Sequence, residues 1–417
     1  MSARRVLAGS ALALLMPASL LMTTQTGSAA DVSQAAGLSA GSATAQARKS
    51  VQGDFAKRRM KGQKVTIQAL PQIVQQGKGV ASASAAKAGI TATIKPVKAG
   101  RPVVLEVQRG SRWAKVGKTK LTSKGHAEFA ATISSGGLPL TYRVVAAKFK
   151  GLAKVTSQGV DTSRWLTPTF SDEFSGSALS PAWTHRGQSY EPASLRVCSK
   201  GDPSAVRVGG GQVRVSVIKD RTRKTKCKAR ANGKVIGKFA YRNNGHIGTE
   251  HAASIRYGFA AARVKFQKQR GQHGSFWMQP VTTERSGKYP ATNGAEIDII
   301  EYFGEPHPNG GITSFIHHKQ GNKDIKTGSW IKNSRSFLKN KRDGWSKAFH
   351  VFSVEWTPST YILRIDGKET WRTNKGVSGV SQFPILSLLA SDYELKNAKD
   401  GQLPQHMYVD WVRLWQA

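Results

Sequence analysis

Residues 296–301 read Glu-Ile-Asp-Ile-Ile-Glu, and this is the most informative stretch of the chain for its fold. Its three acids are interleaved with large β-branched residues, a pattern typical of a β-strand. Alternate side chains of a strand share a face, so Glu296 and Asp298 point the same way. Glu301 returns to that face only if the strand contains a β-bulge of one extra residue. The stretch therefore predicts a bulged strand with three carboxyls on one surface and isoleucines behind it.

Two interpretations of this strand are open. Alternation of acids and aliphatic residues is common where one face of an antiparallel strand meets water. Two separated carboxyls on the wall of a cleft also suit glycoside hydrolysis, in which one attacks the sugar and the other protonates the leaving oxygen. The chain has 25 Asp and Glu against 63 Lys and Arg, so three acids within six positions are unusual here. This scarcity favours the catalytic interpretation.

The N-terminal segment, residues 1–30, has the features of a secretory signal peptide. Arg4–Arg5 precede an apolar stretch over 6–22, and the small residues at 28–30 fit a cleavage site. An uncleaved membrane anchor is the alternative, although the apolar run is short for a membrane span. We therefore expect an exported protein, extracellular or associated with the cell wall, in which residues 31–63 form a flexible basic leader.

Cysteine content and charge agree with export. Cys198 and Cys227 are the two cysteines, and in an exported protein a disulfide is the natural interpretation, with two buried free thiols as the alternative. The formal net charge of +38 is spread over both halves of the chain, which argues against a single nucleic-acid-binding tail. A surface rich in Lys and Arg attracts polyanions, here anionic wall polymers or acidic polysaccharides, although solubility alone is the alternative. We expect no nucleic-acid partner and a monomer.

The rest of the chain reads as two β-rich domains. Residues 64–160 contain short strand patterns separated by turn signals, which predict a small β-sandwich that loosely resembles the immunoglobulin-like modules of exported bacterial enzymes. Residues 166–417 contain strand patterns without an amphipathic helix of ordinary length, which predicts one large all-β sandwich or barrel. Asp366–Gly367 marks a hairpin turn within this second domain.

The second domain resembles family 16 of the glycoside hydrolases, which contains laminarinases, agarases and κ-carrageenases. Residues 296–301 match the bulged form of that family's catalytic strand. Further matching segments follow in the family's order, at residues 170–174, 257–265, 274–278, 349–358, 366–367 and 409–415. The resemblance implies a concanavalin-like jelly roll of two antiparallel sheets, with the substrate cleft on the concave face.

Position by position, the resemblance implies a nucleophile at Glu296, a general acid/base at Glu301, and Asp298 between them as the residue that holds or shares a proton. Two long side chains leaning inward from a concave sheet can bring their carboxyls to the roughly 5–5.5 Å of a retaining pair. We therefore expect a covalent glycosyl-enzyme intermediate and retained configuration. Burial and neighbouring carboxylates should raise the pKa of Glu301, which has to hold a proton near neutral pH.

Four residues are candidate substrate contacts. Trp277 is a candidate stacking wall beside the scissile bond, with core packing as the alternative. Arg263 would point polar atoms toward a sugar, or would pair with an acid. The family position of His317 implies a contact near the leaving group, with His318 facing solvent unless the register slips by one residue. Trp330 is expected in a polar loop, where an exposed indole often contacts ligand.

Metal binding is expected only in a structural role. Glu173 and Asp410 match the acids that help members of the family to hold a calcium ion on the convex side, and ion pairs are the alternative for both. The chain has no HExxH motif and no Cys/His cluster, so we expect no catalytic cofactor.

Three functions are compatible with these patterns. The first is a secreted endo-β-glycanase that acts on β-1,3- or β-1,3/1,4-glucan. The second is a hydrolase of an anionic, galactan-type glycan, because the basic segments at 221–228 and 270–273 depart from the family pattern and could border the cleft. The third is a non-catalytic protein that binds sugars or cell wall. The sequence leaves open whether water or a sugar accepts the glycosyl group.

Overall fold

The computed structural model describes residues 62–192, 194–281 and 289–417. The predicted signal peptide and all but the last two residues of the predicted leader lie outside these ranges. Within them, no helix is long and apolar enough to span a membrane.

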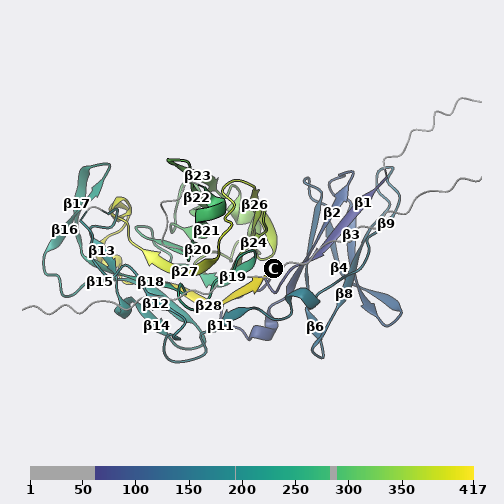
Figure 1. Ribbon diagram of the computed structural model, residues 1–417, viewed down its shortest axis with the longest axis horizontal. Helices are drawn as coiled ribbons and strands as arrows, with labels where there is room; N and C mark the ends of the chain where they lie inside the picture. Colours follow the sequence, from purple (N-terminus) through teal and green to yellow (C-terminus); the bar gives the residue numbers. More distant parts are fainter. Residues whose placement is uncertain (1–61, 193, 282–288) are drawn as a thin grey trace, which may run out of the picture. The chain divides into compact units, whose positions relative to one another are not determined.

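A sandwich of two small antiparallel sheets forms the first part of the described chain (Figure 1). One sheet contains β1 (Lys64–Ala69), β2 (Ala88–Lys95) and β5 (His126–Ala131). The other contains β3 (Pro102–Arg109), β4 (Arg112–Lys120), β8 (Thr141–Ala146), β9 (Val155–Thr156) and β10 (Val160–Asp161), and a two-stranded ribbon is formed by β6 (Ser134–Ser135) and β7 (Leu138–Pro139). Alternate residues of the strands fill a shared apolar core, which includes Ile90 of β2 and Leu105 of β3. The likeness of this sandwich to immunoglobulin-like modules stays a prediction.

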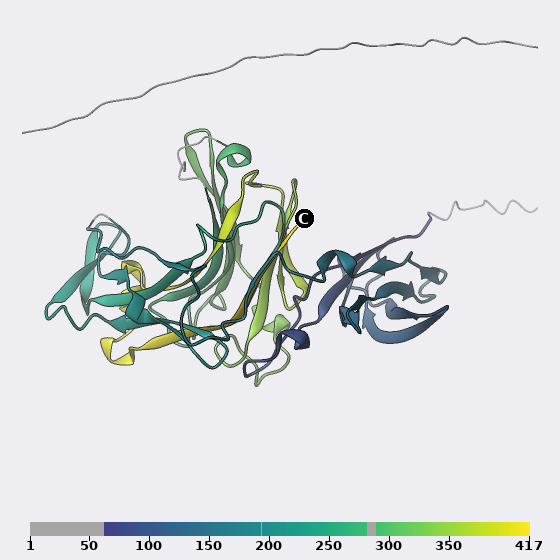
Figure 2. The same cartoon turned by 60° about the horizontal axis from the view of Figure 1, so that its bottom comes forward.

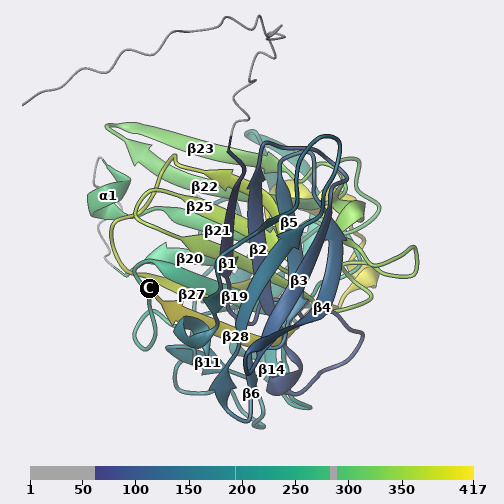
Figure 3. The same ribbon diagram turned by 90° about the vertical axis from the view of Figure 1, so that its right-hand side faces the viewer.

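The second part is an all-β jelly roll, as predicted. Its inner row of strands runs in the order β23 (Lys323–Trp330), β22 (Ile312–Gln320), β21 (Glu296–Tyr302), β20 (His273–Pro280), β27 (Gln382–Leu389) and β18 (Arg242–Gly248). The outer row continues with β15 (Val213–Lys219), β28 (Gln405–Gln416), β19 (Gly258–Lys265), β24 (His350–Trp356), β25 (Tyr361–Ile365) and β26 (Lys368–Thr373). Figure 3 shows β20 to β23 stacked in one row, and Figure 2 shows the same fold turned by 60° from the view of Figure 1.

Strand β18 joins the two rows because its halves have different partners. Its first half, Arg242–Asn244, pairs with β15, and its second half, Gly245–Gly248, pairs with β27. The chain of hydrogen-bonded strands therefore folds back on itself, and one large apolar core lies between the rows. Shorter elements complete the domain: β11 (Phe170–Asp172), β12 (Thr184–His185), β13 (Ser199–Gly201), β14 (Val206–Val208), the hairpin β16 (Lys226–Ala231) and β17 (Lys234–Ala240), and α1 (Pro290–Asn293).

Strand β19 shows how side-chain parity assigns the two faces of the outer row. Ala260, Ala262 and Val264 face the large core. Phe259 points the other way and packs in a separate apolar cluster with Leu70, which belongs to the loop between β1 and β2. Both faces of β19 are therefore buried, and neither of them faces the inner row's concave surface.

Two local predictions are confirmed. Asp366 and Gly367 join β25 to β26 with φ angles of 48° and 78°, as the central residues of a type I′ hairpin turn require. Cys198 and Cys227 form a disulfide with their Cα atoms 5.5 Å apart, so the alternative of two free thiols is excluded. The bond ties the segment that precedes β13 to the hairpin strand β16.

Candidate active site

Strand β21 carries the three acids with the bulge that the sequence predicts. Asp298 pairs with Trp277 on β20 and with Phe315 on β22, and the register shifts before Glu301 pairs with Ser275 and Thr313. The extra residue leaves Ile299 and Ile300 both buried in the core. Glu296, Asp298 and Glu301 consequently line one cavity of about 250 Å³, which we call the catalytic cavity.

The chain enters β21 through a glycine that no larger residue could replace without a clash. Gly294, directly after α1, has φ +84°, and a Cβ atom on it would lie 2.6 Å from Cβ of Pro280 at the end of β20. Only glycine combines this backbone conformation with such a close approach. The turn therefore brings Glu296 to the open end of the strand, where its side chain is half-buried.

Burial sets the protonation state of Glu301. Removal from water, reinforced by the nearby Asp298 carboxyl, raises the pKa of Glu301 to about 8. A carboxylic acid with this pKa is protonated at neutral pH and can donate its proton to a leaving oxygen. The side chain thus has the protonation state that a general acid needs.

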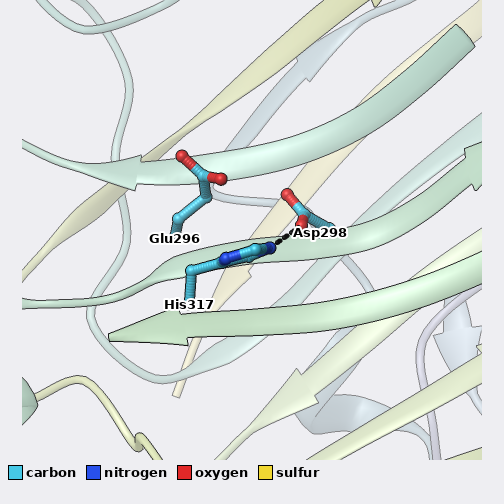
Figure 4. A group of neighbouring side chains, drawn as sticks. All are labelled: Glu296, Asp298 and His317. Carbon is cyan, nitrogen blue, oxygen red and sulfur yellow. Dashed lines mark ion pairs between the residues drawn. The ribbon is translucent and has the colours of Figure 1, made fainter. Parts of the chain in front are cut away.

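Asp298 and His317 form a close pair beside Glu296 (Figure 4). Nε2 of His317 lies 3.2 Å from Oδ2 of Asp298. Burial first, and then the charge of Glu296, raises the pKa of Asp298, whereas burial lowers the pKa of His317. Both directions favour the neutral forms of the two groups. Asp298 can therefore hold a proton next to Glu296, which also accepts a hydrogen bond of 3.3 Å from Nε2 of Gln279.

A buried ion pair that the sequence did not reveal lies at the other end of the catalytic cavity. Nδ1 of His273 is 2.7 Å from Oε2 of Glu394, a residue of the short 3₁₀ turn Asp392–Asn397. Burial alone would lower the pKa of His273, but the Glu394 carboxylate outweighs it and the pKa is raised. The resulting positive charge lowers the pKa of Glu301, against the larger effect of burial. The Ser391-x-x-Glu394 capping box is visible in the sequence, but its partner His273 is 121 residues away.

Replacing Glu394 by Gln should move the pH profile of the enzyme. The variant keeps the shape of the side chain but removes the charge that raises the pKa of His273, and so favours the neutral imidazole. Loss of the His273 charge raises the pKa of Glu301, and loss of the more weakly coupled Glu394 charge only partly opposes this. We expect the alkaline limb of kcat/KM to shift to higher pH, measured from pH 5 to 10 beside the wild type. An unchanged alkaline limb in a folded Glu394→Gln protein would contradict this coupling.

Trp277 lies in the catalytic cavity, but part of its surface is already covered. Its Nε1 donates a hydrogen bond of 3.0 Å to Oγ of Ser387, and its ring stacks on His246 with ring centres 6.0 Å apart. The side chain is half-buried, so it combines the two roles that the sequence left open, packing and a wall of the cavity. Its contact with sugar stays a prediction.

The remaining candidate substrate contacts, His317 and Trp330, lie on neighbouring strands, β22 and β23. His317 and His318 both line a second cavity of about 300 Å³, which we call the β23-side cavity and which shares Gln279 and Glu296 with the catalytic cavity. His318 is half-buried rather than turned into solvent as predicted. Trp330 is the last residue of β23, so the prediction of a loop is wrong; its ring lies 4.5 Å from that of His307.

The prediction of a substrate contact for Arg263 is wrong. This side chain is buried on the outer row, where Nε donates to the backbone oxygen of Gln75 and Nη1 pairs with Asp410. Parity of β19 explains the error, since Arg263 shares the face of Phe259, which points away from the inner row. The alternative, an ion pair with an acid, is what the structure contains.

The two predicted calcium ligands do not fit a hard cation. Asp410 pairs with Arg263, and Glu173 accepts two hydrogen bonds, of 2.7 and 2.9 Å, from the guanidinium of Arg413. Each carboxylate is neutralised by an arginine that a divalent cation would repel. The ion pairs that the sequence left open as the alternative hold both acids.

Two arginines of the catalytic cavity, Arg186 and Arg196, were not found from the sequence. Two basic segments were expected to border the cleft. His273, from segment 270–273, lines this cavity. Arg223, from segment 221–228, packs over the rings of Tyr190 and Tyr241. No pattern in the chain marks Arg196, which reaches the cavity because β13 pairs in parallel with β18.

Comparisons with known proteins gave similar solved structures and one family match. Similar solved structures include the laminarinase catalytic domain of Thermotoga maritima MSB8 (20% identity, covering 60% of this chain and 98% of that chain, TM-score 0.47). The endo-beta-1,3-glucanase of Pyrococcus furiosus is 21% identical and covers 59% of this chain and 92% of its own, with a TM-score of 0.45. No curated protein gave a match. Residues 212–413 match the family model described as glycosyl hydrolases family 16, so the chain carries a domain of this family and is a glycoside hydrolase.

Proposed function

We propose that this protein is a secreted, retaining endo-β-glycanase whose polysaccharide substrate has a β-1,3- or β-1,3/1,4-linked glucan backbone. One observation carries the proposal: Glu296, Asp298 and Glu301 line a single cavity, and the pKa of Glu301 is raised to about 8. An ionised carboxylate and a protonated carboxylic acid are the two groups that double displacement at a sugar needs.

In the proposed mechanism, Glu296 attacks the anomeric carbon while Glu301 gives its proton to the glycosidic oxygen. The bond between the anomeric carbon and that oxygen breaks, and a glycosyl ester forms on Glu296. Glu301, now a carboxylate, removes a proton from water, which attacks the anomeric carbon. The bond from that carbon to the Glu296 carboxylate breaks, and the sugar leaves with its original configuration. Asp298, paired with His317, keeps a proton beside Glu296 and so avoids a second full negative charge next to the nucleophile.

The shape of the cleft supports cleavage within a chain rather than at its end. The β23-side cavity adjoins the catalytic cavity at Glu296, and a third cavity adjoins it at Arg196 and His246. Sugars can therefore be accommodated on both sides of the reacting bond. His246 and Ser275 line the catalytic cavity, and the buried Nε2 of His246 and Oγ of Ser275 have no hydrogen-bond partner among the described residues.

Export and linkage rest on separate arguments. The signal-like residues 1–30 and the Cys198–Cys227 disulfide support secretion. The bulged form of the catalytic strand, which the sequence resemblance associates with laminarinases and agarases, supports a β-1,3-linked backbone. A role as a non-catalytic binding protein is less favourable, because all three carboxyls are present and face the same cavity.

A substrate panel tests the proposal. Purified protein is incubated with laminarin, curdlan, barley β-glucan, cellulose and agarose, and new reducing ends and product lengths are followed over time. We expect early release of oligosaccharides of intermediate length from laminarin or barley β-glucan. Release of glucose alone from the first minutes would contradict internal cleavage, and the absence of products from all five polymers over days would contradict the proposed function.

A further inference from the structure

The cavity next to the catalytic cavity has a basic lining. It measures about 230 Å³ and lies on the β18 side of the inner row. Its charged lining residues are Arg186, Arg196, Lys200 and the exposed Glu191. We call it the Arg196 cavity, because Arg196 lines both it and the catalytic cavity.

Arg196 differs from the other two basic residues in its partners. Arg186 pairs with Glu250 and donates to Oε1 of Gln279, and Nζ of Lys200 lies 3.6 Å from Oδ2 of Asp202. Among the described residues, Arg196 has no carboxylate in ion-pair distance, and its buried Nε has no hydrogen-bond partner. The guanidinium therefore retains a charge and a donor that the described protein groups do not satisfy.

The surroundings of Arg196 make a neutral ligand a poor match. Burial first, and then the charges of Arg186 and Arg196, lower the pKa of His246 to about 3, so this neighbour is neutral and adds no charge to the cavity. A sugar hydroxyl could accept a hydrogen bond from the guanidinium but would leave the charge of this half-buried group uncompensated. An oxyanion would satisfy both, because a guanidinium presents parallel donors that suit sulfate and carboxylate groups.

The position of Arg196 is fixed by the covalent and hydrogen-bonded frame around it. Cys198, two residues later, is bonded to Cys227, and its backbone N–H donates to Asp392. Ser199 and the next two residues then pair with β18. Arg196 is therefore carried on a short segment anchored on one side, which suits a group that has to recognise one substituent.

We infer that the Arg196 cavity is a subsite for an oxyanion carried by the glycan, a sulfate ester or a carboxylate on a sugar beside the one that is cleaved. The inference rests on the proposed function, since the subsite adjoins the cavity that contains Glu301. The inference adds a substrate class to the proposed function. The catalytic cavity recognises the linkage of the glycan backbone, and Arg196 binds a negatively charged substituent.

The test compares one backbone in three charge states. Curdlan, 6-carboxylated curdlan and curdlan sulfate of matched length are assayed with wild type, Arg196→Gln, Arg196→Lys and Lys228→Gln. The last variant removes one exposed positive charge from a residue that lines none of the three cavities, and it controls for net charge. A charge-assisted hydrogen bond is worth about 10- to 100-fold in affinity, so we expect the wild type to favour one anionic polymer by at least about 10-fold in kcat/KM.

Arg196→Gln should lower kcat/KM on the favoured anionic polymer at least about 10-fold more than on neutral curdlan, so that the preference is lost. Arg196→Lys should keep part of the preference, and Lys228→Gln should keep all of it. The preference should shrink as salt is raised. Equal preference in the wild type and in a folded Arg196→Gln protein would overturn the inference, as would a wild type that favours the neutral polymer over both derivatives.

A binding measurement separates this inference from the proposed function. Oligosaccharides from the three polymers are titrated calorimetrically into Glu296→Gln protein with and without Arg196→Gln. Tighter binding of an anionic oligosaccharide that requires Arg196 supports the subsite even if no polymer is cleaved. Cleavage of neutral glucan without such a binding difference would leave the proposed function intact and overturn the subsite.

Discussion

Replacing Glu296 by Ala should lower kcat on a polysaccharide by at least about 10⁴-fold, since loss of a covalent nucleophile costs up to about 10⁶ in well-studied hydrolases. The variant should fold, because Glu296 is half-buried at the start of β21 and its hydrogen bond from Gln279 is 3.3 Å long. Added azide should then restore turnover of a substrate with an activated leaving group. Because azide would attack from the side that Glu296 occupied, the product should be the α-glycosyl azide.

The control for this experiment is Glu296→Gln, which fills the space of the carboxylate. We expect it to be as inactive as the alanine variant and not to respond to azide. Activity of either variant within about 10-fold of wild type would remove Glu296 from the nucleophile position. Formation of a β-glycosyl azide by Glu296→Ala would place the nucleophile elsewhere among the three acids.

Replacing Glu301 by Gln should cost about 10²–10⁴-fold in kcat on polysaccharide, the usual contribution of general acid–base catalysis. The loss should be much smaller for the first step with an aryl glycoside, because a good leaving group needs no proton. Glu301→Ala with azide should yield the β-glycosyl azide, formed on the intermediate, in contrast to the α product from Glu296→Ala. The pair of azide products thus distinguishes the two carboxyls.

The pH profile of kcat/KM is a second test of the role of Glu301. With its pKa raised to about 8 by burial and by Asp298, Glu301 is protonated below that pH and loses its proton above it. Wild-type kcat/KM should therefore fall as the pH rises through about 8, and Glu301→Gln should lack this alkaline limb. An alkaline limb near pH 8 that persists unchanged in Glu301→Gln would assign the titration to another group.

Local rules explain which parts of the molecule could be predicted. The bulged strand follows from a period of two and a count of six residues, and the hairpin at Asp366–Gly367 follows from the φ angles that its turn type needs. The disulfide follows from the presence of only two cysteines in a chain with a signal-like start. None of these requires knowledge of which strands become neighbours.

The errors arise where strand partners decide the outcome. Arg263 belongs to a segment that reads as a strand, but this strand, β19, pairs with β24 and β28 in the outer row. The local sequence around Trp330 suggests a loop, and only the pairing of β23 with β22 makes it a strand residue. The His273–Glu394 pair and the approach of Arg196 to the catalytic cavity both join segments more than 100 residues apart, and no local pattern encodes them. Sequence periodicity assigns a face to a side chain but not the sheet to which that face belongs.

The configuration of the first product tests the central claim most directly. Hydrolysis of a laminari-oligosaccharide, or of the best polymer of the panel, is followed by proton NMR from the first minute, before mutarotation equilibrates the new reducing end. A retaining pair of Glu296 and Glu301 predicts that the β-anomer appears first and the α-anomer grows in later. Initial release of the α-anomer would mean single displacement by water between carboxyls about 6.5–9.5 Å apart, and would contradict a covalent intermediate on Glu296.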